Sequence, residues 1–261
     1  RNATARGATV LFAETPADIN ALVLEIAAKH GVAKIIKSKS MVSEESALDH
    51  AIEAAGLTVV ETDLGEYILQ INDYEAPSHI IGPALHKSKE EVAELFHKAH
   101  GTPVKTGIEE LCLEARGVLR QHYLTADMGI SGGNFFVAET GSVVLVTNEG
   151  NATLTTTLPK VHVAISGIEK IVPTLEDAAT ILRVLARSAT GQDFSNYTTL
   201  STGPKRPDDL DGPEEYHVVI LDNGRSDVLG TEFQDMLRCI RCGACLNHCP
   251  VYQAVGGHAY G

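Results

Sequence analysis

A run of four cysteines near the C-terminus constrains this chain more than any other feature of its sequence. The four lie within eleven residues in the pattern C-x2-C-x2-C-x3-C-P: Cys239, Cys242, Cys245 and Cys249. This pattern is typical of thiolate ligands to a 4Fe-4S cluster. The two-residue spacers let consecutive sulfurs converge on one small inorganic core, and Gly243 relieves crowding where the backbone approaches it. The run therefore predicts an iron–sulfur cluster.

Two other interpretations of the cysteine run stay open. A zinc site usually places two pairs of cysteines on separate loops, whereas here all four lie in one short run. Disulfides are disfavoured because evenly spaced near neighbours cannot pair comfortably. We expect His248, which lies inside the run, to tune or shield the cluster rather than to ligate it.

The same run indicates that its ligand set is incomplete. In two-cluster ferredoxins the fourth cysteine of such a run ligates the other cluster, which takes its remaining ligands from a second run. The fifth cysteine of this chain, Cys112, lies far upstream, and the 261 residues hold no second run. We therefore expect the chain, which begins at Arg1 and ends at Gly261, to be a piece of a longer protein. In this piece Cys249 would lack its cluster, and the remaining cluster would be labile or absent.

Upstream of the cysteines, short apolar runs alternate with amphipathic helical patterns. The expected strands are 32–36, 57–61, 79–81, 135–138, 143–147, 161–165 and 216–221. The expected helices are 15–31, 43–56, 66–71, 88–101, 107–123, 174–188 and 231–237, with Thr15, Ser43, Ser88 and Thr174 as caps. Such alternation predicts an α/β fold with a parallel sheet covered by helices.

The length of the chain suits one large domain and a short appendage. We expect the domain to comprise residues 1–228 and the cysteine segment to comprise residues 229–261. Residues 190–215 are rich in Gly, Pro, Asp and Thr and are expected to form a loop.

Charge and hydropathy exclude several classes of partner. The formal net charge of −13 argues against a nucleic acid, because its phosphates would be repelled. No apolar run reaches the roughly 18 residues that a membrane span needs. A thiolate motif without other paired cysteines suits a reducing compartment, so we expect a cytoplasmic protein.

Polar residues and glycines crowd the turns between residues 127 and 151. In a mostly parallel sheet, ligands bind beyond the carboxyl ends of the strands, where glycines admit a ligand close to the backbone and exposed amides can hold an anion. The candidate substrate-binding residues are Ser131, Gly132, Gly133, Asn134, Thr140, Gly141, Asn148 and Asn151. Plain turns explain the same residues, and both interpretations stay open.

Four further side chains are candidates for chemistry, each with a simpler explanation. Lys37 and Lys39 precede a predicted helix and could hold a carboxylate or phosphate, although surface lysines after a strand are common. Glu139 could act as a nucleophile or base if desolvated, although a hydrogen-bonded turn carboxylate explains it as well. His162 could act as a base, although a packed histidine is the simpler interpretation of its apolar strand.

The sequence resembles a known family over nearly its whole length. The segments that carry the resemblance are 37–45 (KSKSMVSEE), 61–67 (ETDLGEY), 77–80 (PSHI), 138–142 (AETGS), 147–151 (TNEGN), 187–192 (RSATGQ), 211–215 (DGPEE), 239–252 (CIRCGACLNHCPVY) and 256–261 (GGHAYG). They resemble the lactate utilization protein B family. The family's second cysteine run is the part that this chain does not contain.

The resemblance implies a LUD domain with the NagB/RpiA/CoA-transferase-like fold, followed by a ferredoxin-type region with two 4Fe-4S clusters. It implies an iron–sulfur subunit that works with other subunits in a bacterial complex oxidising L-lactate to pyruvate, and we expect the isolated piece to be inactive. An alternative is a small-molecule enzyme similar to CoA-transferases or cyclo-ligases, acting in a crevice between Asn134 and Glu139 with Lys37 or Lys39 holding an anion. A third possibility is a non-catalytic assembly or regulatory module.

Overall fold

The computed structural model describes residues 1–260, so Gly261, the last residue of the predicted segment 229–261, lies outside the described residues. The strands are β1 (Thr9–Ala13), β2 (Lys34–Lys37), β3 (Thr58–Glu61), β4 (Met128–Ser131), β5 (Phe135–Val137), β6 (Ser142–Thr147), β7 (Val161–Gly167), β8 (Ile171–Val172), β9 (Tyr197–Ser201) and β10 (Glu215–Leu221). The α-helices of the main body are α1 (Asn2–Ala5), α2 (Pro16–Lys29), α3 (Met41–Glu45), α4 (Leu48–Ala54), α5 (Leu64–Gln70), α6 (Lys89–His100), α7 (Ile108–Thr125), α8 (Asn151–Thr157), α9 (Leu175–Thr190) and α10 (Arg225–Val228). The cysteine segment adds α11 (Ala244–His248), α12 (Pro250–Val255) and α13 (Gly257–Tyr260), and two 3-10 turns are η1 (Ile168–Lys170) and η2 (Gln234–Arg238).

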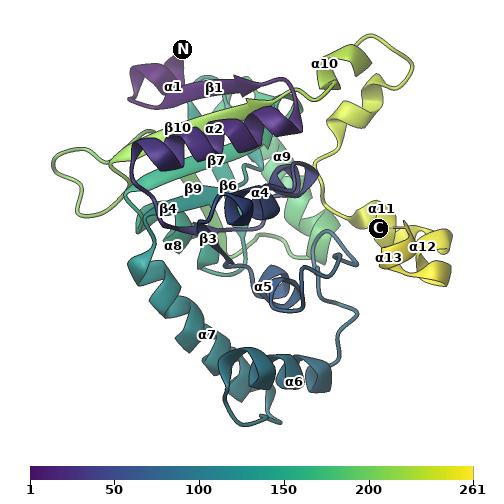
Figure 1. The fold of residues 1–261 in the computed structure, drawn as a ribbon. Helices are drawn as coiled ribbons and strands as arrows, with labels where there is room; N and C mark the ends of the chain where they lie inside the picture. Colours follow the sequence, from purple (N-terminus) through teal and green to yellow (C-terminus); the bar gives the residue numbers. More distant parts are fainter. Residues whose placement is uncertain (261) are drawn as a thin grey trace.

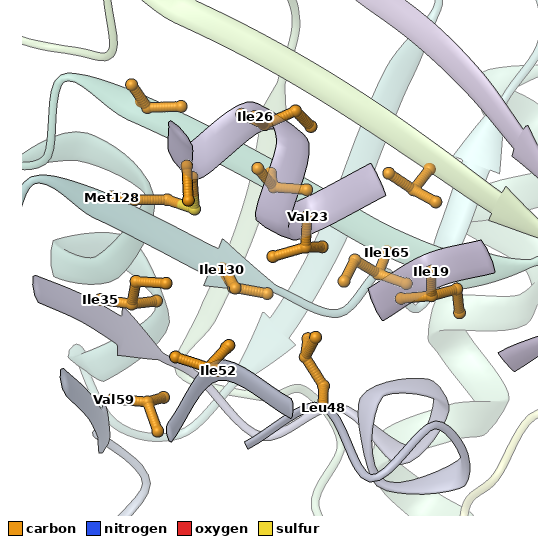
Figure 2. Packing of buried hydrophobic residues seen from close by; sticks show 14 of the residues in the cluster. Ile19, Val23, Ile26, Ile35, Leu48, Ile52, Val59, Met128, Ile130 and Ile165 are labelled. Atoms are coloured by element: carbon orange, nitrogen blue, oxygen red, sulfur yellow. The ribbon is translucent and has the colours of Figure 1, made fainter. Parts of the chain in front are cut away.

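A six-stranded parallel sheet forms the centre of the molecule, in the order β1-β10-β7-β4-β2-β3 (Figure 1). Ile35, Ile130 and Ile165 on its inner strands are fully buried, as expected for a sheet covered on both faces. Helices α2 and α4 cover one face, where Figure 2 shows Val23 and Ile52 packed among these strand residues. The predicted α/β fold with a parallel sheet is confirmed.

A second sheet of four strands, in the order β8-β5-β6-β9, packs against the other face of the first. Phe136 and Val143 of the second sheet share an apolar cluster with Ala164 and Val218 of the first. The outer face of the second sheet is covered by α9 through Ala178 and Leu185, and other residues of that cluster are Phe135, Val137, Val144 and Val172. The second sheet is therefore buried between the main sheet and α9.

Most predicted helices form, and their caps explain where they begin. Reciprocal capping boxes join Thr15 to Asp18, Ser88 to Glu91, and Thr174 to Asp177. Each hydroxyl accepts a hydrogen bond from a first-turn N–H, which would otherwise have no partner in the helix.

The helix predicted to begin at Ser43 was placed wrongly. The side chain of Ser40 accepts a hydrogen bond from the N–H of Ser43, so α3 begins one residue after Ser40. The chain then breaks at Ala47, which has a left-handed φ of 49°, and α4 follows. Two short helices therefore replace the single predicted one.

The predicted strand at 79–81 is wrong, because this segment is a loop in the structure. The His79 ring accepts hydrogen bonds from the N–H groups of Ile81 and Gly82 at 3.1 and 3.4 Å. These donors are therefore satisfied locally, and the sequence offers no sign of that arrangement.

Other segments also hold regular structure that was not predicted, among them strands β1, β4 and β8. Residues 190–215, expected to form a loop, include β9, which pairs with β6 as an edge strand of the second sheet. The turn predicted at 148–151 continues into α8. The mainly exposed side chains of β9 give no alternating apolar pattern from which a strand could be recognised.

The cysteine segment leaves the main body after α10 and ends in three short helices at one side of the molecule (Figure 1). It contacts the loop between α5 and α6, where the hydroxyl of Tyr252 donates to the carbonyl of Ser78 at 2.6 Å. The boundary at residue 228 stays a prediction. Within residues 1–260, no helix is both long enough and apolar enough to cross a lipid bilayer.

Candidate functional site

A cavity of about 270 Å³ lies beyond the carboxyl ends of β2, β4 and β7. Lys39 follows β2, the loop 132–134 follows β4, and Ser166 lies near the end of β7. Asn148 and α9 close the cavity from the side of the second sheet. This is the edge at which parallel α/β sheets bind ligands.

Six of the predicted binding residues line this cavity: Lys39, Gly132, Gly133, Asn134, Asn148 and Asn151. Within the residues that the structure describes, the other predicted binding residues do not line it: Lys37, Ser131, Thr140 and Gly141. Neither do the two candidates for catalysis, Glu139 and His162. Ligand binding by the first group stays a prediction.

The cavity wall carries more cationic than anionic side chains. Lys39, Lys170 and Arg241 line it together with two carboxylates, Asp63 and Glu149. The ammonium group of Lys39 donates to the carbonyl of Ile81 at 2.9 Å and lies 3.9 Å from the Asp63 carboxylate. An anionic ligand is therefore favoured over a cationic one.

Part of the polar lining is used by the protein itself. The side-chain oxygen of Asn134 accepts from the N–H of Val146 at 2.9 Å, and the amide of Asn148 donates to Gln192 at 2.9 Å. A Cβ added to Gly132 would lie 3.3 Å from the carbonyl oxygen of Lys39. These residues therefore shape the loops of the cavity, as the turn interpretation expects.

Lys37 is neither on the surface nor in this cavity, because its side chain is only 2% exposed. It forms an ion pair with Glu61, lies 3.5 Å from Asp49, and donates to the hydroxyl of Ser43 at 3.2 Å. Burial by itself lowers the pKa of Lys37, but the two carboxylates outweigh it and raise this pKa above its ordinary value. Lys37 therefore stays charged.

Two further carboxylates surround this lysine and were missed in the sequence. Glu44 and Glu66 line a second, smaller cavity of about 200 Å³ together with Lys37, Asp49 and Glu61. Burial raises the pKa of Glu66 to about 7, and the neighbouring Glu44 adds to the shift. Burial likewise raises the pKa of Glu44. In the sequence, the only sign of this charged cluster is that two apolar strands end in charged residues, β2 in Lys37 and β3 in Glu61.

Glu139 lies exposed in the turn between β5 and β6. Its carboxylate accepts from the N–H of Leu175, at the start of α9, at 3.1 Å. The same turn packs against α1, because the side chain of Asn2 donates to the carbonyl of Glu139 at 2.9 Å and a Cβ on Gly141 would lie 2.3 Å from the nitrogen of Ala3. These contacts fit the interpretation as a hydrogen-bonded turn carboxylate.

His162 is fully buried in β7. Its Nε2 lies 2.8 Å from the hydroxyl of Ser131, and its ring packs beside Tyr216 with the centroids 5.0 Å apart. Burial lowers the pKa of His162 to about 3, with a further contribution from His217. The ring is therefore neutral, as expected for a packed histidine.

The cysteine run forms a tight turn that leads into α11 at the edge of the first cavity. Cys239 and Cys245 are exposed, whereas Cys242 and Cys249 are half-buried. The N–H of Arg241 points to the sulfur of Cys239 at 3.4 Å, and left-handed φ angles at Arg241 and Gly243 bend the chain. Four thiols in this spacing and an N–H donor to a sulfur fit the ligand set of an iron–sulfur cluster.

The cysteine run and the cavity share a wall. Ile240 and Arg241, between the first two cysteines, line the cavity. Lys170, which also lines it, donates a hydrogen bond to the carbonyl of Cys239. Burial lowers the pKa of Lys170, while the adjacent Glu169 opposes that shift. Sequence analysis missed this contact because it joins residues far apart in the chain.

Comparison with known proteins finds two family matches along the chain. Residues 1–221 match the LUD domain, and residues 235–261 match the 4Fe-4S dicluster domain. The chain is 53% identical over 260 residues to lactate utilization protein B of Geobacillus sp. (strain WCH70) and 55% identical over 260 residues to lactate utilization protein B of Lysinibacillus sphaericus (strain C3-41). Each alignment covers 100% of this chain and 55% of the relative, so the chain spans about half the length of the curated relatives that it matches.

One solved structure is also similar, that of a DUF162 family protein from Deinococcus radiodurans. It is 15% identical with a TM-score of 0.32, and the match covers 80% of this chain and 99% of that chain. A similarity this low carries no argument about function.

Proposed function

Because the chain belongs to the LUD domain family, we propose that it is the iron–sulfur, electron-transfer part of a protein that takes part in oxidising L-lactate to pyruvate. The relatives named lactate utilization protein B, which match this chain from end to end, support the link to lactate. The match to the 4Fe-4S dicluster domain supports the cofactor. When bound, such a cluster accepts and releases single electrons.

The observation that carries this proposal is the wall shared by the cysteine run and the cavity. Lys39 and Arg241 line the cavity, where an organic acid would find cationic groups for its carboxylate. Arg241 lies between Cys239 and Cys242, so a carboxylate bound there would lie next to the cluster ligands. A short separation between an organic substrate and a redox centre is what electron transfer requires.

We assign ligand roles within the run as the spacing suggests. Cys239, Cys242 and Cys245 would hold one cluster, and Cys249 would serve a second cluster whose other ligands come from a second cysteine run. The partners would be the remaining subunits of a lactate-oxidising complex. The reducing cytoplasm is the compartment that suits such thiolates.

The alternative of an enzyme similar to CoA-transferases is not favoured. Its candidate residue Glu139 is exposed and hydrogen-bonded to the start of α9. Glu139 is not among the residues that line the cavity with Asn134.

The first experiment tests the cofactor. This chain, and a version extended to the length of the curated relatives, would be purified without oxygen, and iron, acid-labile sulfide and visible absorbance would be measured for each. We expect about eight irons per extended chain and few in this chain. An extended chain that holds no iron, or only zinc, would show that the proposal is wrong.

The second experiment tests the link to lactate and the shared wall. With the partner subunits present, L-lactate should bleach the visible band of the extended chain, whereas acetate should not. Arg241→Ala should slow this bleaching about tenfold or more, the scale of one lost charge-assisted hydrogen bond. Arg238→Ala is the matched control, since Arg238 is exposed and contacts only Asp235 among the ion pairs seen in residues 1–260. Equal bleaching rates in Arg241→Ala and Arg238→Ala would show that the cavity does not bind the substrate for electron transfer.

A further inference from the structure

Two histidines and a glutamate meet where the cysteine segment contacts the main body. Glu75 and His86 belong to the loop between α5 and α6, and His258 belongs to α13. One possible ligand atom from each of the three lies within 4.8 Å of the other two. The rings of His86 and His258 are in edge contact, with their centroids 4.4 Å apart.

In both His86 and His258, one ring nitrogen is hydrogen-bonded to a neighbouring oxygen and the second ring nitrogen is the possible ligand. In His86, Nδ1 lies 2.8 Å from the hydroxyl of Ser78, while Nε2 faces Glu75 Oε1 at 3.2 Å. In His258, Nε2 lies 3.0 Å from the carbonyl oxygen of Ala76 and therefore donates to it, which leaves Nδ1 as the nitrogen that could ligate. Metal-binding histidines are oriented in this way, with one nitrogen donating to an outer group and the other ligating.

The carboxylate completes a suitable set of donors. Lys87 pairs with Glu75 Oε2 at 2.5 Å and leaves Oε1 facing His86. Two imidazoles and one carboxylate are a ligand set for zinc and for ferrous iron, with open positions left for water or substrate.

Access and position also suit a metal ion. Glu75 and His86 are half-buried and His258 is exposed, so an ion can enter from solvent. The three ligands come from both sides of the contact between the main body and the cysteine segment. An ion bound to them would add a cross-link beside the hydrogen bond from Tyr252 to Ser78.

We propose that Glu75, His86 and His258 bind a divalent first-row transition-metal ion that ties the cysteine segment to the main body. This site is separate from the cysteine run and does not depend on the proposed electron transfer. Its ligands are nitrogen and oxygen atoms, which distinguishes it from the sulfur ligands of the cluster.

Cobalt is the probe, in a chain whose run cysteines are all replaced by serine so that thiolates cannot compete for the ion. Titration with Co²⁺, followed by visible absorbance and by metal analysis after desalting, should show an equivalent of bound metal that His86→Ala and His258→Ala lose. Each of these two substitutions should weaken Co²⁺ binding by more than roughly 10–100-fold, which is the effect of losing a residue that only hydrogen-bonds to a ligand. Glu75→Gln, which keeps the shape of the side chain, should weaken it as well.

The matched control is His97→Ala, because His97 is exposed on α6 and contacts the carbonyl of Thr102. It should keep the full equivalent. Co²⁺ that binds elsewhere on the chain stays bound in every variant. The site is therefore measured by the Co²⁺ that the parent chain binds and the His86 and His258 variants do not. A parent chain that binds no Co²⁺, or histidine variants that bind as much as the parent, would overturn the site.

Hydrogen exchange tests the cross-link without any measurement of activity. Co²⁺ should slow amide exchange in residues 250–259 of the parent at least severalfold and leave His258→Ala unchanged. Equal exchange with and without metal in the parent would overturn the tying role. Iron content of the cysteine-containing chain is measured separately, so failure here leaves the cluster proposal standing.

Discussion

The main body and the cysteine segment are held in place by different kinds of interaction. In β7 and β4 every residue is buried, and in β10 every residue but Glu215 is buried. In the segment, the only buried residues among 229–259 are two glycines, Gly243 and Gly257. The main body is therefore stabilised by apolar burial, whereas the segment has no core of its own.

The segment is held instead by contacts with the main body, where Ile240 and Cys242 pack against the apolar cluster under α9. A Cβ on Gly257 would lie 1.7 Å from the carbonyl oxygen of Ser78, so the two backbones touch at this point. In small metal-binding regions, the free energy of binding the metal is free energy of folding. The comparison teaches that this segment should order with its ligands, while the main body should fold without them.

The largest expected effect separates the two regions directly. Ile130→Ala removes a fully buried side chain from β4, which should lower the free energy of unfolding by about 2–5 kcal/mol. Met236→Ala is the control in the segment, where the side chain is 72% exposed, and should change it by less than about 0.5 kcal/mol. Urea denaturation followed by circular dichroism measures both, and similar losses would break the comparison.

The next largest effect concerns a buried carboxyl group in the main body, that of Glu66. A pKa of about 7 for Glu66 in the folded state, against 4.5 in the unfolded chain, corresponds to about 3 kcal/mol. Between these two values the unfolded chain ionises Glu66 and the folded protein does not. This contribution to stability is therefore fully present below pH 4.5 and is lost as the pH rises through 7.

Glu66→Gln should remove that pH dependence. The variant should gain up to about 3 kcal/mol over the parent at pH 8 and match it at pH 4.5, because an amide resembles the protonated carboxyl. Urea denaturation at the two pH values measures the difference. Glu94→Gln, at an exposed position on α6, is the control. A gain of the same size at both pH values would contradict the assigned pKa.

The smallest expected effect concerns the contact between the two regions. Tyr252→Phe removes the hydroxyl that donates to the carbonyl of Ser78 at 2.6 Å, a loss of about 0.5–1.5 kcal/mol. It should speed amide exchange in residues 250–259 by up to about tenfold and leave urea denaturation of the main body unchanged. Tyr197→Phe, on the exposed edge strand β9, is the control. Lower stability of the main body in Tyr252→Phe would show that the two regions are coupled.

Features that depend on near neighbours in the chain were predictable. The capping boxes at Thr15, Ser88 and Thr174 each join residues three positions apart, and all three are present. Four strands of the parallel sheet were recognised as apolar runs, whereas β1 and β4 were not predicted. Strand β9 was missed because most of its side chains are exposed and only its pairing with β6 makes it a strand.

The candidate site was predictable only in part, because it also depends on contacts between residues far apart in the chain. Lys39 and Asn134 were expected near a crevice and line it, since both follow strands of the parallel sheet. Lys37, two residues before Lys39, was expected beside it and is instead buried against Glu61. Whether a lysine at a strand end is buried depends on which strand lies next to it, and here that neighbour is β3.

The sequence by itself determined most of the longer helices and four strands of the parallel sheet. It also predicts the cluster ligands, because the cysteine spacing places the four sulfurs in one short segment whatever the rest of the chain does. The tertiary structure alone decided that Arg241 shares a cavity with Lys39, and that His258 meets Glu75 and His86. These groups are far apart in the chain, and the order of the strands and the packing of the whole core bring them together. Local geometry follows from the backbone, whereas long-range contacts follow from the most favourable burial of the complete chain.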